Sequence, residues 1–451
     1  MTFTNNTKRR LPLLDDSRFN SLTVRAIVLL IGAVLCALGI AQIVEMFLEN
    51  TAYPANTDLS LYLRAADTVL AGGNPYDRTI NTGFDIYGYP PLLADVLALM
   101  SATIGANAIH TLWPFLCAAS LIASIVLVCR GFGVRIGWHW IVLIIGLLSL
   151  SRLVRIDIYH GQVNFFILLL VVGSLLLRAR GQLILAALCL AIAMSLKPFF
   201  GILAIYFVVR KDWRMAIYSV GLGAVVFFLS FVPLYATVIE SFQGWRDASS
   251  QLITGASGAR GDNQSLYGLF LRMFTTTPFS TPWLENSTLV PVFTTLGVVV
   301  AGAFAWFLFS SPRNAVPALA PQRLPVALLE CTTVLALSLA CGPYTEGDHI
   351  FFTLAALAVT IILGVERWRD QGPHTKLWIA TALAWSISVG FIALPKSVWF
   401  TLGTPGSYND LSGSLILLSG RNGLLLLLAG AMTAITLGME RRSAGQQVSA
   451  A

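Results

Sequence analysis

The chain has 451 residues, of which 56% are hydrophobic and only 11% are charged. Ordinary soluble domains carry about 25% charged residues, so the composition excludes an ordinary soluble enzyme. The formal net charge is +7, but the basic residues lie in short loops between apolar runs, which indicates membrane topology rather than nucleic-acid binding. The apolar runs have about the length that crosses a bilayer. We therefore expect an all-α, polytopic transmembrane protein.

The first apolar run, 24–48, follows a basic start at Lys8, Arg9 and Arg10. It is too long for the core of a signal peptide and lacks a clear cleavage pattern. We expect it to be retained as the first crossing.

A charged stretch, NTDLSLYLRAADTVLAGGNPY, begins at Asn56 directly after this run. Thr57 or Asp58 can cap a helix that ends near Ala71, before a glycine pair. Asp58 and Tyr62 fall on one face of that helix. Asp58 is then either the helix cap or a carboxylate held at the membrane surface. There the helix N-terminus favours its charge, and it can take a proton from a hydroxyl.

The next segment, GGNPYDRTINTGFDIYGYPP at 72–91, is rich in Gly, Asn, Pro and Tyr, which is typical of a structured loop. Taken alone it fits a linker equally well. The apolar run 90–102 is too short to span a bilayer, so we expect an interfacial or re-entrant helix.

The segment SRLVRIDIYHGQVN at 151–164 is expected to be an outer loop that gathers Arg152, Arg155 and His160 near the membrane surface. The planar fork of an arginine suits a phosphate. The alternative is that each arginine extends to lipid headgroups.

The run 183–209 contains Lys197-Pro198 in its middle. Proline removes a backbone donor and disfavours helix in the residue before it, so we divide the run into two short crossings. Lys197 would lie at the tip of this hairpin, either extended to the interface or bound to a phosphate.

Two later outer segments carry further polar residues, GARGDNQSLYGLFLR at 258–272 and CGPYTEGDHIFF at 341–352. The first segment supplies hydrogen-bond donors, but their spacing matches no fixed catalytic pattern. The second places Glu346, Asp348 and His349 before a crossing, where a lone histidine is more often a cap or an interfacial residue. Adjacent residues diverge on a helix, so a metal site at Asp348 and His349 is not expected. Glu330, inside a crossing, is expected to extend inward or to find an arginine partner.

Together these runs predict about twelve crossings. The expected spans are 24–48, 106–129, 138–150, 162–177, 183–196, 198–209, 214–236, 291–310, 325–341, 349–365, 376–394 and 412–438. With the N-terminus in the cytoplasm, 19 of the 29 Lys and Arg residues lie on the inner side and 10 on the outer side, which fits the positive-inside rule. The long segments 49–105 and 237–290 are then outside, where most acidic residues also lie.

Several kinds of site have no signal in the sequence. The six cysteines form no C-x-x-C pair, so neither a disulfide framework nor a zinc site is indicated. No P-loop, dinucleotide fingerprint or nucleophile elbow is present. We therefore expect no cofactor and assign no metal ligands, and the sequence leaves a metal requirement open.

Five short motifs occur in a characteristic order. They are the early D…Y..AA…G.NPY…Y.YPP block, GQVN, LKP, NQSL.G…R and GPYTEGDH. In this order the chain resembles the membrane glycosyltransferases of the GT-C superfamily. It resembles in particular glycosyltransferase family 87, the polyprenyl-phosphate-mannose mannosyltransferases of phosphatidylinositol mannosides and related arabinofuranosyltransferases. The resemblance runs over roughly 56–350.

The resemblance implies an inverting enzyme of the bacterial cytoplasmic membrane that works on the extracytoplasmic face. It would move one sugar, mannose or arabinofuranose, from a polyprenyl-phosphate donor to an acceptor hydroxyl. It implies one catalytic domain over 1–451, with a first crossing at 24–48, a catalytic outer loop at 49–105, core crossings at 106–236, a second outer loop at 237–290 and C-terminal crossings at 291–438.

The resemblance also implies roles for individual residues. Asp58 would be the base, and His349 is the nearest match to a second catalytic residue, although the chain reads GPYTEGDH where those relatives tend to have Trp and paired His. The donor phosphate would meet Arg155, Lys197, Arg272, Arg152 and Arg260. The substrates would contact Tyr62, Asn74, Tyr76, Tyr89, His160, Gln162, Asn164, Asn263, Glu346 and Asp348.

The expected partners are the lipid-linked sugar donor, a glycolipid, polysaccharide or protein acceptor, and membrane lipid, with no nucleic acid. Two other functions stay open at this point. A secondary transporter predicts an inverted repeat and ionisable residues near the bilayer midplane, and neither is evident. An oligosaccharide ligase or lipid-carrier flippase would share the cationic outer loops but move a longer glycan.

Overall fold

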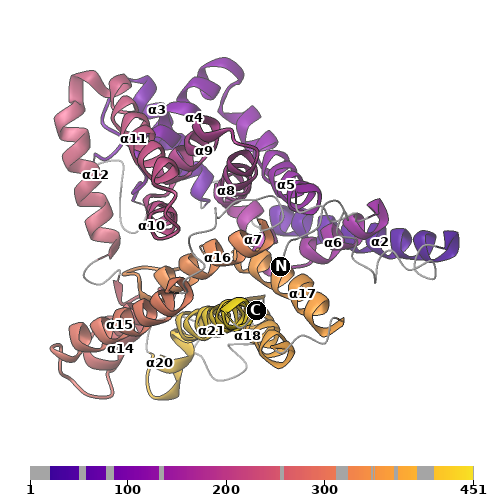
Figure 1. The fold of residues 1–451 in the computed structure, drawn as a ribbon. Coiled ribbons are helices and arrows are strands. Elements are labelled where there is room, and N and C mark those ends of the chain that lie inside the picture. Colours follow the sequence, from indigo (N-terminus) through magenta and orange to yellow (C-terminus); the bar gives the residue numbers. More distant parts are fainter. Residues whose placement is uncertain are drawn as a thin grey trace. The chain divides into compact units, whose positions relative to one another are not determined.

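The structure is a computed structural model that describes residues 21–49, 57–77, 86–131, 137–253, 258–310, 324–346, 349, 351–369, 374–393 and 411–449. The regular elements within these residues are helices, which confirms the all-α expectation (Figure 1). The chain divides into two compact units, each described here by itself. Unit 1 comprises Met1–Phe200, Arg214–Ala248 and Leu319–Leu324, and unit 2 comprises Gly201–Trp213, Ser249–Ala318 and Pro325–Ala451.

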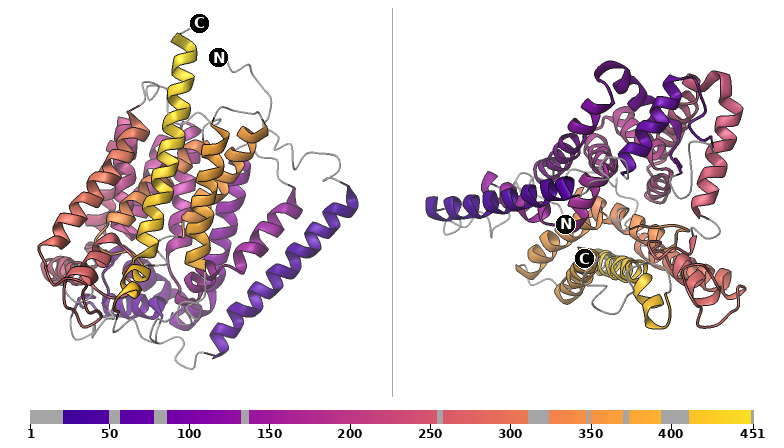
Figure 2. Two further views of the ribbon diagram at one scale, coloured as in Figure 1. Left: turned by 90° about the horizontal axis from the view of Figure 1, so that it is seen from below. Right: turned by 180° about the vertical axis from the view of Figure 1, so that it is seen from behind.

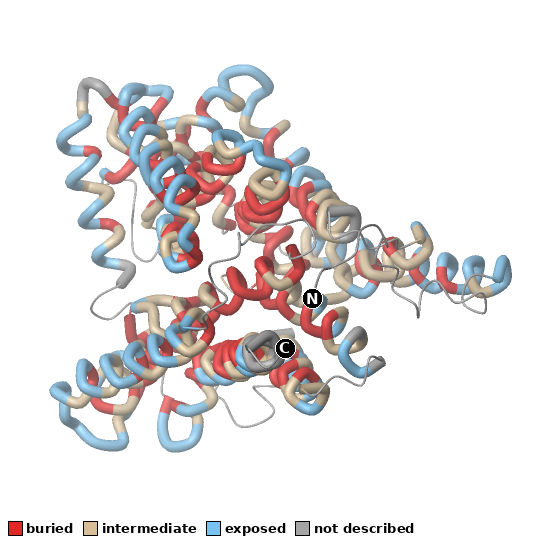
Figure 3. Tube along the Cα trace, in the orientation of Figure 1, coloured by how far each residue is buried: buried red, intermediate tan, exposed pale blue. Residues whose placement is uncertain are grey.

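Unit 1 contains most of the helices from the N-terminal half of the chain. They are α2 (Leu22–Glu49), α3 (Asp58–Leu70), α4 (Pro91–Ile104), α5 (Ala106–Gly131), α6 (Trp138–Ser149), α7 (Arg152–His160), α8 (Asn164–Ala179), α9 (Leu183–Leu196), α11 (Trp213–Leu229), the 3₁₀ turn η2 (Val232–Thr237) and most of α12 (Val238–Ile253). Within this unit α3 packs on α4, and α8 packs on both α5 and α9. The inner residues of α8 and α9 are among the buried segments coloured red in Figure 3.

The short helix α3 has the boundaries that its sequence predicts. Thr57 is the N-cap, because its side-chain oxygen accepts a hydrogen bond from the Ser60 N–H at 3.2 Å. The helix ends before Gly72, whose φ of +71° is the left-handed conformation that favours glycine. Tyr62 and Ala65 lie on the same face as Asp58 and are buried.

The segment 151–164 differs from the expected loop. Residues 152–160 form the helix α7, because Leu153, Val154, Asp157 and Ile158 recur at helical spacing and are buried on one face. α7 and α8 meet at a bend of 110°.

The break at Lys197-Pro198 is confirmed. α9 ends at Leu196, and Lys197 has extended backbone angles before the 3₁₀ turn η1 (Pro198–Gly201). The helix α4 is likewise confirmed as a short apolar helix, with Pro91 in its first turn.

Within unit 1, the first long helix, α2, packs mainly against α6. The contact uses small residues, since a Cβ built on Gly32 would lie 2.7 Å from the Leu143 backbone nitrogen, and one on Gly146 would lie 2.7 Å from the Gly32 carbonyl oxygen. Close backbone approach through glycine is a common way for membrane helices to associate. Much of the remaining surface of α2 is exposed and apolar, as expected for a helix facing lipid (Figure 3).

Unit 2 contains the helices from the C-terminal half of the chain. They are α10 (Ile202–Val209), α14 (Leu266–Phe274), α15 (Leu289–Phe309), α16 (Leu324–Cys341, from its second residue), α17 (Thr353–Arg369), α18 (Thr375–Ala393), α20 (Ser414–Ser419) and α21 (Arg421–Ser449). The long helix α21 packs on α15 and α18, and its parallel run beside α18 is visible in the left view of Figure 2.

Glu330 of α16 lies inside unit 2 and is nearly fully buried. Its carboxylate pairs with Arg210 at 3.5 Å and with Arg441, and it accepts a hydrogen bond from the Tyr206 hydroxyl at 3.0 Å. The expectation that this carboxylate finds an arginine partner is confirmed. The pairing ties α16 to α21, because separating a buried ion pair is strongly destabilising.

Six helices in the described residues are long and apolar enough to cross a membrane, or seven if α7 and α8 are one bent span. They include α2, α5, α15 and α21 over most of their lengths. Several other expected crossings, such as 138–150 and 183–196, form shorter apolar helices. The chain is therefore a multi-pass membrane protein, and the count of twelve crossings stays a prediction.

Candidate active site

Asp58 is the first residue of α3 and not its cap, since Thr57 fills that role. Its side chain is 37% exposed, so solvent or a substrate can reach it. The N-terminal end of a helix carries unpaired N–H groups and a partial positive charge, which stabilise a carboxylate. The sequence left a choice between a cap and an exposed carboxylate, and the geometry removes the first reading.

Gln162 reaches Asp58 from the turn between α7 and α8. Gly161 ends α7 with a φ of +70°, and the Gln162 N–H returns to the Asp157 carbonyl oxygen at 2.9 Å. Two residues of α5 hold this turn in place. Trp113 Nε1 donates to the Gly161 carbonyl oxygen at 2.8 Å, and Cys117 Sγ donates to that of Gln162 at 3.5 Å. The turn is thus fixed by a backbone hydrogen bond of its own and by two side chains of α5.

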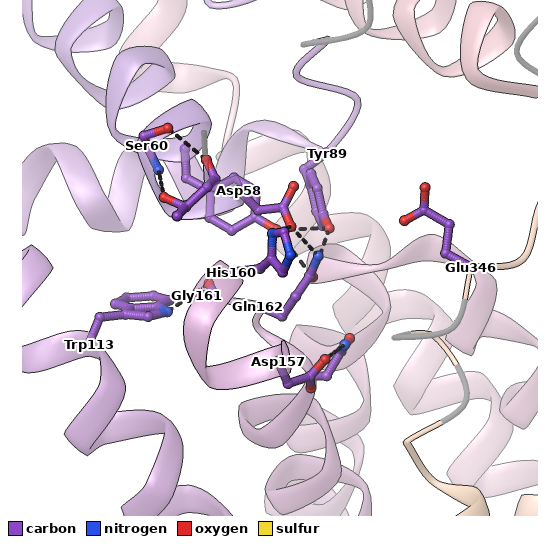
Figure 4. Close-up of polar contacts among 12 residues, drawn as sticks. Asp58, Ser60, Tyr89, Trp113, Asp157, His160, Gly161, Gln162 and Glu346 are labelled. Atoms are coloured by element: carbon purple, nitrogen blue, oxygen red, sulfur yellow. Dashed lines mark hydrogen bonds and ion pairs between the residues drawn. The ribbon is translucent and has the colours of Figure 1, made fainter. Parts of the chain in front are cut away.

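The Gln162 side chain bridges the Asp58 carboxylate and the donors on its other side, and Figure 4 shows it beside Asp58 and Tyr89. Its Nε2 donates to Asp58 Oδ2 at 2.6 Å. Its Oε1 accepts from Lys197 Nζ at 3.2 Å, and the hydroxyls of Tyr62 and Tyr89 lie 3.3 and 3.4 Å away. A hydrogen bond to a carboxylate is short and strong, and it favours the ionised form.

Lys197 connects this bridge to a second carboxylate. Its Nζ also donates to Asn164 Oδ1 at 2.8 Å, and Asn164 Nδ2 donates to Asp157 Oδ1 at 3.0 Å. Lys197 is 4% exposed, and Asp157 and Asn164 are completely buried. Asp157, Asn164, Lys197, Gln162 and Asp58 therefore form one continuous polar chain. We call these five residues, with Tyr62, Tyr89 and His160, the Gln162 cluster.

His160 and two tyrosines border the carboxylate. His160 Nδ1 lies 3.8 Å from Asp58 Oδ2, an ion pair only when the imidazole is protonated. Tyr62 donates its hydroxyl proton to the Tyr89 hydroxyl at 3.0 Å, and the two rings meet edge to face. Lys197 lies over the Tyr89 ring, 5.6 Å from its centroid. The cluster thus places one half-exposed carboxylate in front of a buried cation.

Other residues of the 72–91 segment contact Tyr89 and Tyr62 of this cluster. Tyr76 donates to the Tyr89 carbonyl oxygen at 2.8 Å, and the Asn74 side chain accepts from the Tyr76 N–H at 3.0 Å. Tyr87 is buried beside Tyr62. Burial raises the pKa values of Tyr76 and Tyr87 above their ordinary value, so both remain neutral hydroxyls. Asn74 and Tyr76 therefore shape the loop.

Arg155 and Arg152 both lie on α7. Arg155 is half-buried, and its Nε is buried with no hydrogen-bond partner among the described residues. A buried donor without a partner is costly, so a bound anion would stabilise it. Arg152 is also half-buried.

Arg272 lies in unit 2 and is completely buried. Its Nε donates to Ser419 Oγ at 2.7 Å, its Nη1 to the Arg260 carbonyl oxygen at 2.6 Å, and its Nη2 to the Asn263 carbonyl oxygen at 2.9 Å. Burial lowers the pKa of Arg272 to about 9. Every nitrogen of this guanidinium is occupied by the protein itself.

Asn263 is buried in the same way. Its Nδ2 donates to the carbonyl oxygens of Gly258 and Pro343, and its Oδ1 accepts from the Ser265 and Thr345 N–H groups. It joins the segment before α14 to the segment after α16. Arg272 and Asn263, with their partners, form what we call the Arg272 clamp.

The remaining residues expected at the site lie near the clamp in unit 2. Arg260 Nη2 forms an ion pair with Asp262 at 2.5 Å. The Tyr344 hydroxyl donates to Glu346, and the Glu346 N–H donates to His349 Nδ1 at 3.2 Å. Burial raises the pKa of Tyr344, and the nearby Glu346 carboxylate raises it further. Asp348 lies outside the described residues.

The described residues contain no group of three or more His, Cys, Asp or Glu side chains that could hold a metal ion. The Gln162 cluster itself offers a lysine, an amide and hydroxyl groups that can stabilise charge.

The sequence did not single out three residues that the cluster depends on. Asp157 could have been noticed as an acidic residue between two isoleucines in RIDIYHGQVN. Trp113 and Cys117 gave no signal, because an apolar run is the usual place for both. Their contact with the turn at Gly161 depends on how α5 packs against α8.

The site thus holds a half-exposed carboxylate that can accept a proton, backed by an amide bridge and a buried lysine. The model of glycosyltransferase family 87 matches residues 87–338, which is more than half of the chain, and the protein belongs to this family. The matched part includes Tyr89, Gln162 and Lys197 but begins after Asp58 and ends before Glu346. No curated protein and no solved structure matches the chain.

Proposed function

We propose that this glycosyltransferase moves one sugar from a polyprenyl-phosphate donor to an acceptor hydroxyl on the extracytoplasmic face, with Asp58 as the general base. The acceptor oxygen forms a bond to the anomeric carbon while the bond from that carbon to the donor phosphate breaks. The hydroxyl proton passes to Asp58, and the polyprenyl phosphate leaves. Attack opposite the leaving phosphate inverts the anomeric configuration.

The observation that carries the proposal is the position of Asp58. The carboxylate begins a helix, receives a short hydrogen bond from Gln162 and is still 37% exposed. These features support an ionised base with access to a substrate. A carboxylate that served only to cap α3 would contact the backbone of its own helix, and Thr57 does so instead.

The leaving phosphate requires cations. Arg155 is our first choice, because its Nε has no partner within the described residues. Arg152, from the same helix, is the second choice, and Arg260 is a half-exposed candidate in unit 2. We give Arg272 and Asn263 a structural role, since their polar atoms already bind the protein. His349 and Glu346 remain candidates for acceptor contacts.

Membership of the family favours glycosyl transfer over transport. The sugar, mannose or arabinofuranose, and the acceptor, a glycolipid, polysaccharide or protein, are open parts of the proposal. Assays with polyprenyl phosphates carrying each sugar would identify the donor. We expect transfer of a single sugar, and movement of a preassembled glycan would favour a ligase or flippase instead.

The test is Asp58→Asn, with Asp67→Asn as the matched control. Both residues lie on α3, and Asp67 is exposed. A positioned base typically contributes about 10²–10⁴-fold, so Asp58→Asn should lose that much transfer activity while donor binding and the melting temperature stay close to wild type. Asp67→Asn should be fully active. Near-normal transfer by folded Asp58→Asn would end the assignment of the base.

The extracytoplasmic face is tested separately by labelling introduced cysteines with a membrane-impermeant reagent. Thr276 and Lys211 are both exposed in unit 2, and the charge distribution places them on opposite sides. Thr276→Cys should react in intact cells, and Lys211→Cys only after permeabilisation. The reverse pattern would overturn the orientation.

A further inference from the structure

The polar chain behind Asp58 has a branched arrangement centred on Lys197. One branch runs from Lys197 through Gln162 to Asp58, and the other runs through Asn164 to Asp157. Each branch has the same order: an ammonium, the oxygen of an amide, the nitrogen of that amide and a carboxylate. The first branch ends at a half-exposed group, and the second ends at a completely buried one.

This order fixes which way each amide points. A lysine ammonium has only donors and a carboxylate has only acceptors, so an amide between them must turn its oxygen to the lysine and its nitrogen to the carboxylate. The Tyr89 hydroxyl strengthens this orientation, because it accepts the Tyr62 proton and can give its own proton to Gln162 Oε1. Asp58 alone would fix the orientation of the Gln162 amide less strongly, because the Asp58 carboxylate is partly solvated.

Burial suits Lys197 to orienting the two amides and makes it a poor ligand for a mobile phosphate. It is 4% exposed, and two side-chain amides accept its N–H groups at 3.2 and 2.8 Å. An ammonium has three donors. Because two of these donors hold the two branches in place, the buried ammonium cannot move toward a phosphate without breaking them.

We propose that Lys197 is a positioning residue, which acts through the Gln162 amide to aim a hydrogen-bond donor at Asp58. This inference rests on the proposed role of Asp58 as base. It replaces the prediction that Lys197 binds the donor phosphate. Without the lysine, the Gln162 amide can rotate and present its oxygen to Asp58. The charged form of Asp58 then loses its short hydrogen bond and meets a repelling oxygen instead.

The two roles of Lys197 predict different measurements. A phosphate ligand contributes to donor affinity, so its loss raises the donor Kd. A positioning residue leaves donor binding nearly unchanged but lowers kcat and moves the acid limb of the pH–rate profile to higher pH. Such orienting contacts are typically worth about 10–100-fold in activity. A lost hydrogen bond to a carboxylate moves the limb by about one pH unit.

Lys197→Gln and Lys197→Arg form the informative pair. A glutamine offers both a donor and an acceptor, so it no longer dictates the Gln162 orientation, whereas an arginine is again only a donor. Lys197→Gln should lose about 10–100-fold in kcat and show the shifted acid limb, with donor Kd within about twofold of wild type. Lys197→Arg should recover part of the loss. Lys376→Gln, at an exposed lysine of α18, is the control for a lost charge.

Because other ionisable groups surround Asp58, the pH–rate measurement is repeated in a second mutant background. His160 faces it at 3.8 Å, Tyr62 and Tyr89 contact its amide partner, Asp157 ends the other branch, and Asp95 lies on the neighbouring helix α4. Of these groups, His160 can pair with the Asp58 carboxylate directly. The shift caused by Lys197→Gln should therefore persist in a His160→Asn background.

Two results would overturn the inference. One is a Lys197→Gln variant with weakened donor binding and an unchanged acid limb, which would return the lysine to the phosphate. The other is a Lys197→Arg variant no more active than Lys197→Gln. If Lys197→Gln does not fold, Gln162→Met is used, which removes the bridge but keeps the lysine, and an unchanged acid limb there overturns the inference. Near-normal transfer by Asp58→Asn would instead remove the proposed base, so the two failures are distinguishable.

Discussion

The Gln162 cluster and the Arg272 clamp are built from the same kinds of residues, but their hydrogen bonds end in different places. In the cluster, side chains bind side chains, and the chain of contacts ends at a half-exposed carboxylate. In the clamp, Arg272 and Asn263 bind mostly backbone carbonyls and N–H groups, and both are completely buried. The first arrangement leaves a reactive group accessible, whereas the second satisfies the backbone of a loop. Residue type alone does not separate a site from a structural contact.

The largest effect on stability is expected from Arg272→Lys in the clamp. A lysine ammonium cannot reproduce the planar fork, so the carbonyls of Arg260 and Asn263 lose buried donors. Each unsatisfied buried group costs about 1–3 kcal/mol, and the variant should lose several degrees in melting temperature. A folded Arg272→Lys with wild-type stability but weakened donor binding would make Arg272 a ligand and erase the contrast between the two regions.

A smaller loss of stability, accompanied by lower activity, is expected from Gly161→Ala in the cluster. Gly161 has a φ of +70°, which costs about 1–2 kcal/mol for a residue with a Cβ. The added Cβ would also lie 2.6 Å from Leu59 Cβ, and Leu59 follows Asp58 on α3. The clash should push α3 away from Gln162, so transfer should fall more than the melting temperature predicts. Gly173→Ala in α8, where an added Cβ meets nothing within 4 Å, is the control. Unchanged transfer by folded Gly161→Ala would show that the turn does not position Asp58.

The smallest effect concerns a second carboxyl group of unit 1. Asp95 of α4 has one buried oxygen without a partner among the described residues, and burial raises its pKa from 3.8 to about 7. Because the folded state holds this proton more tightly, the stabilising contribution is complete below the unfolded pKa and is lost as pH rises through about 7. Asp95→Asn should therefore raise the melting temperature at pH 8 more than at pH 5. An equal change at both pH values would show that Asp95 does not titrate in this range.

Much of the local structure follows from the sequence. The helix from Asp58, the break at Lys197-Pro198 and the short helix from Pro91 depend on caps, glycine and proline, which act within a few residues. The helix α7 was missed because its flanking polar residues resemble a loop, although its apolar spacing is helical. Short-range signals therefore predicted these boundaries more reliably than the polar composition did.

The connections within the site could not be predicted in the same way. Asp58 and Gln162 are separated by 104 positions in the chain, and their contact depends on how α3, α5 and α7 pack. The sequence indicated both residues as site candidates but not the bridge between them. It also grouped Arg272 with the phosphate ligands, because it does not show which backbone carbonyls surround an arginine. Only the tertiary structure shows where the donors of a polar side chain are used.

The central claim is that Gln162 and its buried partners serve the proton transfer at Asp58. A double-mutant cycle of Asp58→Asn and Gln162→Met, measured by transfer from a polyprenyl phosphate-sugar, tests this claim most directly. Gln162→Met alone should lower the rate by about 10–100-fold. In the Asp58→Asn background it should change the residual rate by less than about twofold, because the carboxylate that it assists is already gone. Equal fold losses in the two backgrounds would contradict the claim, since Gln162 would then act independently of Asp58.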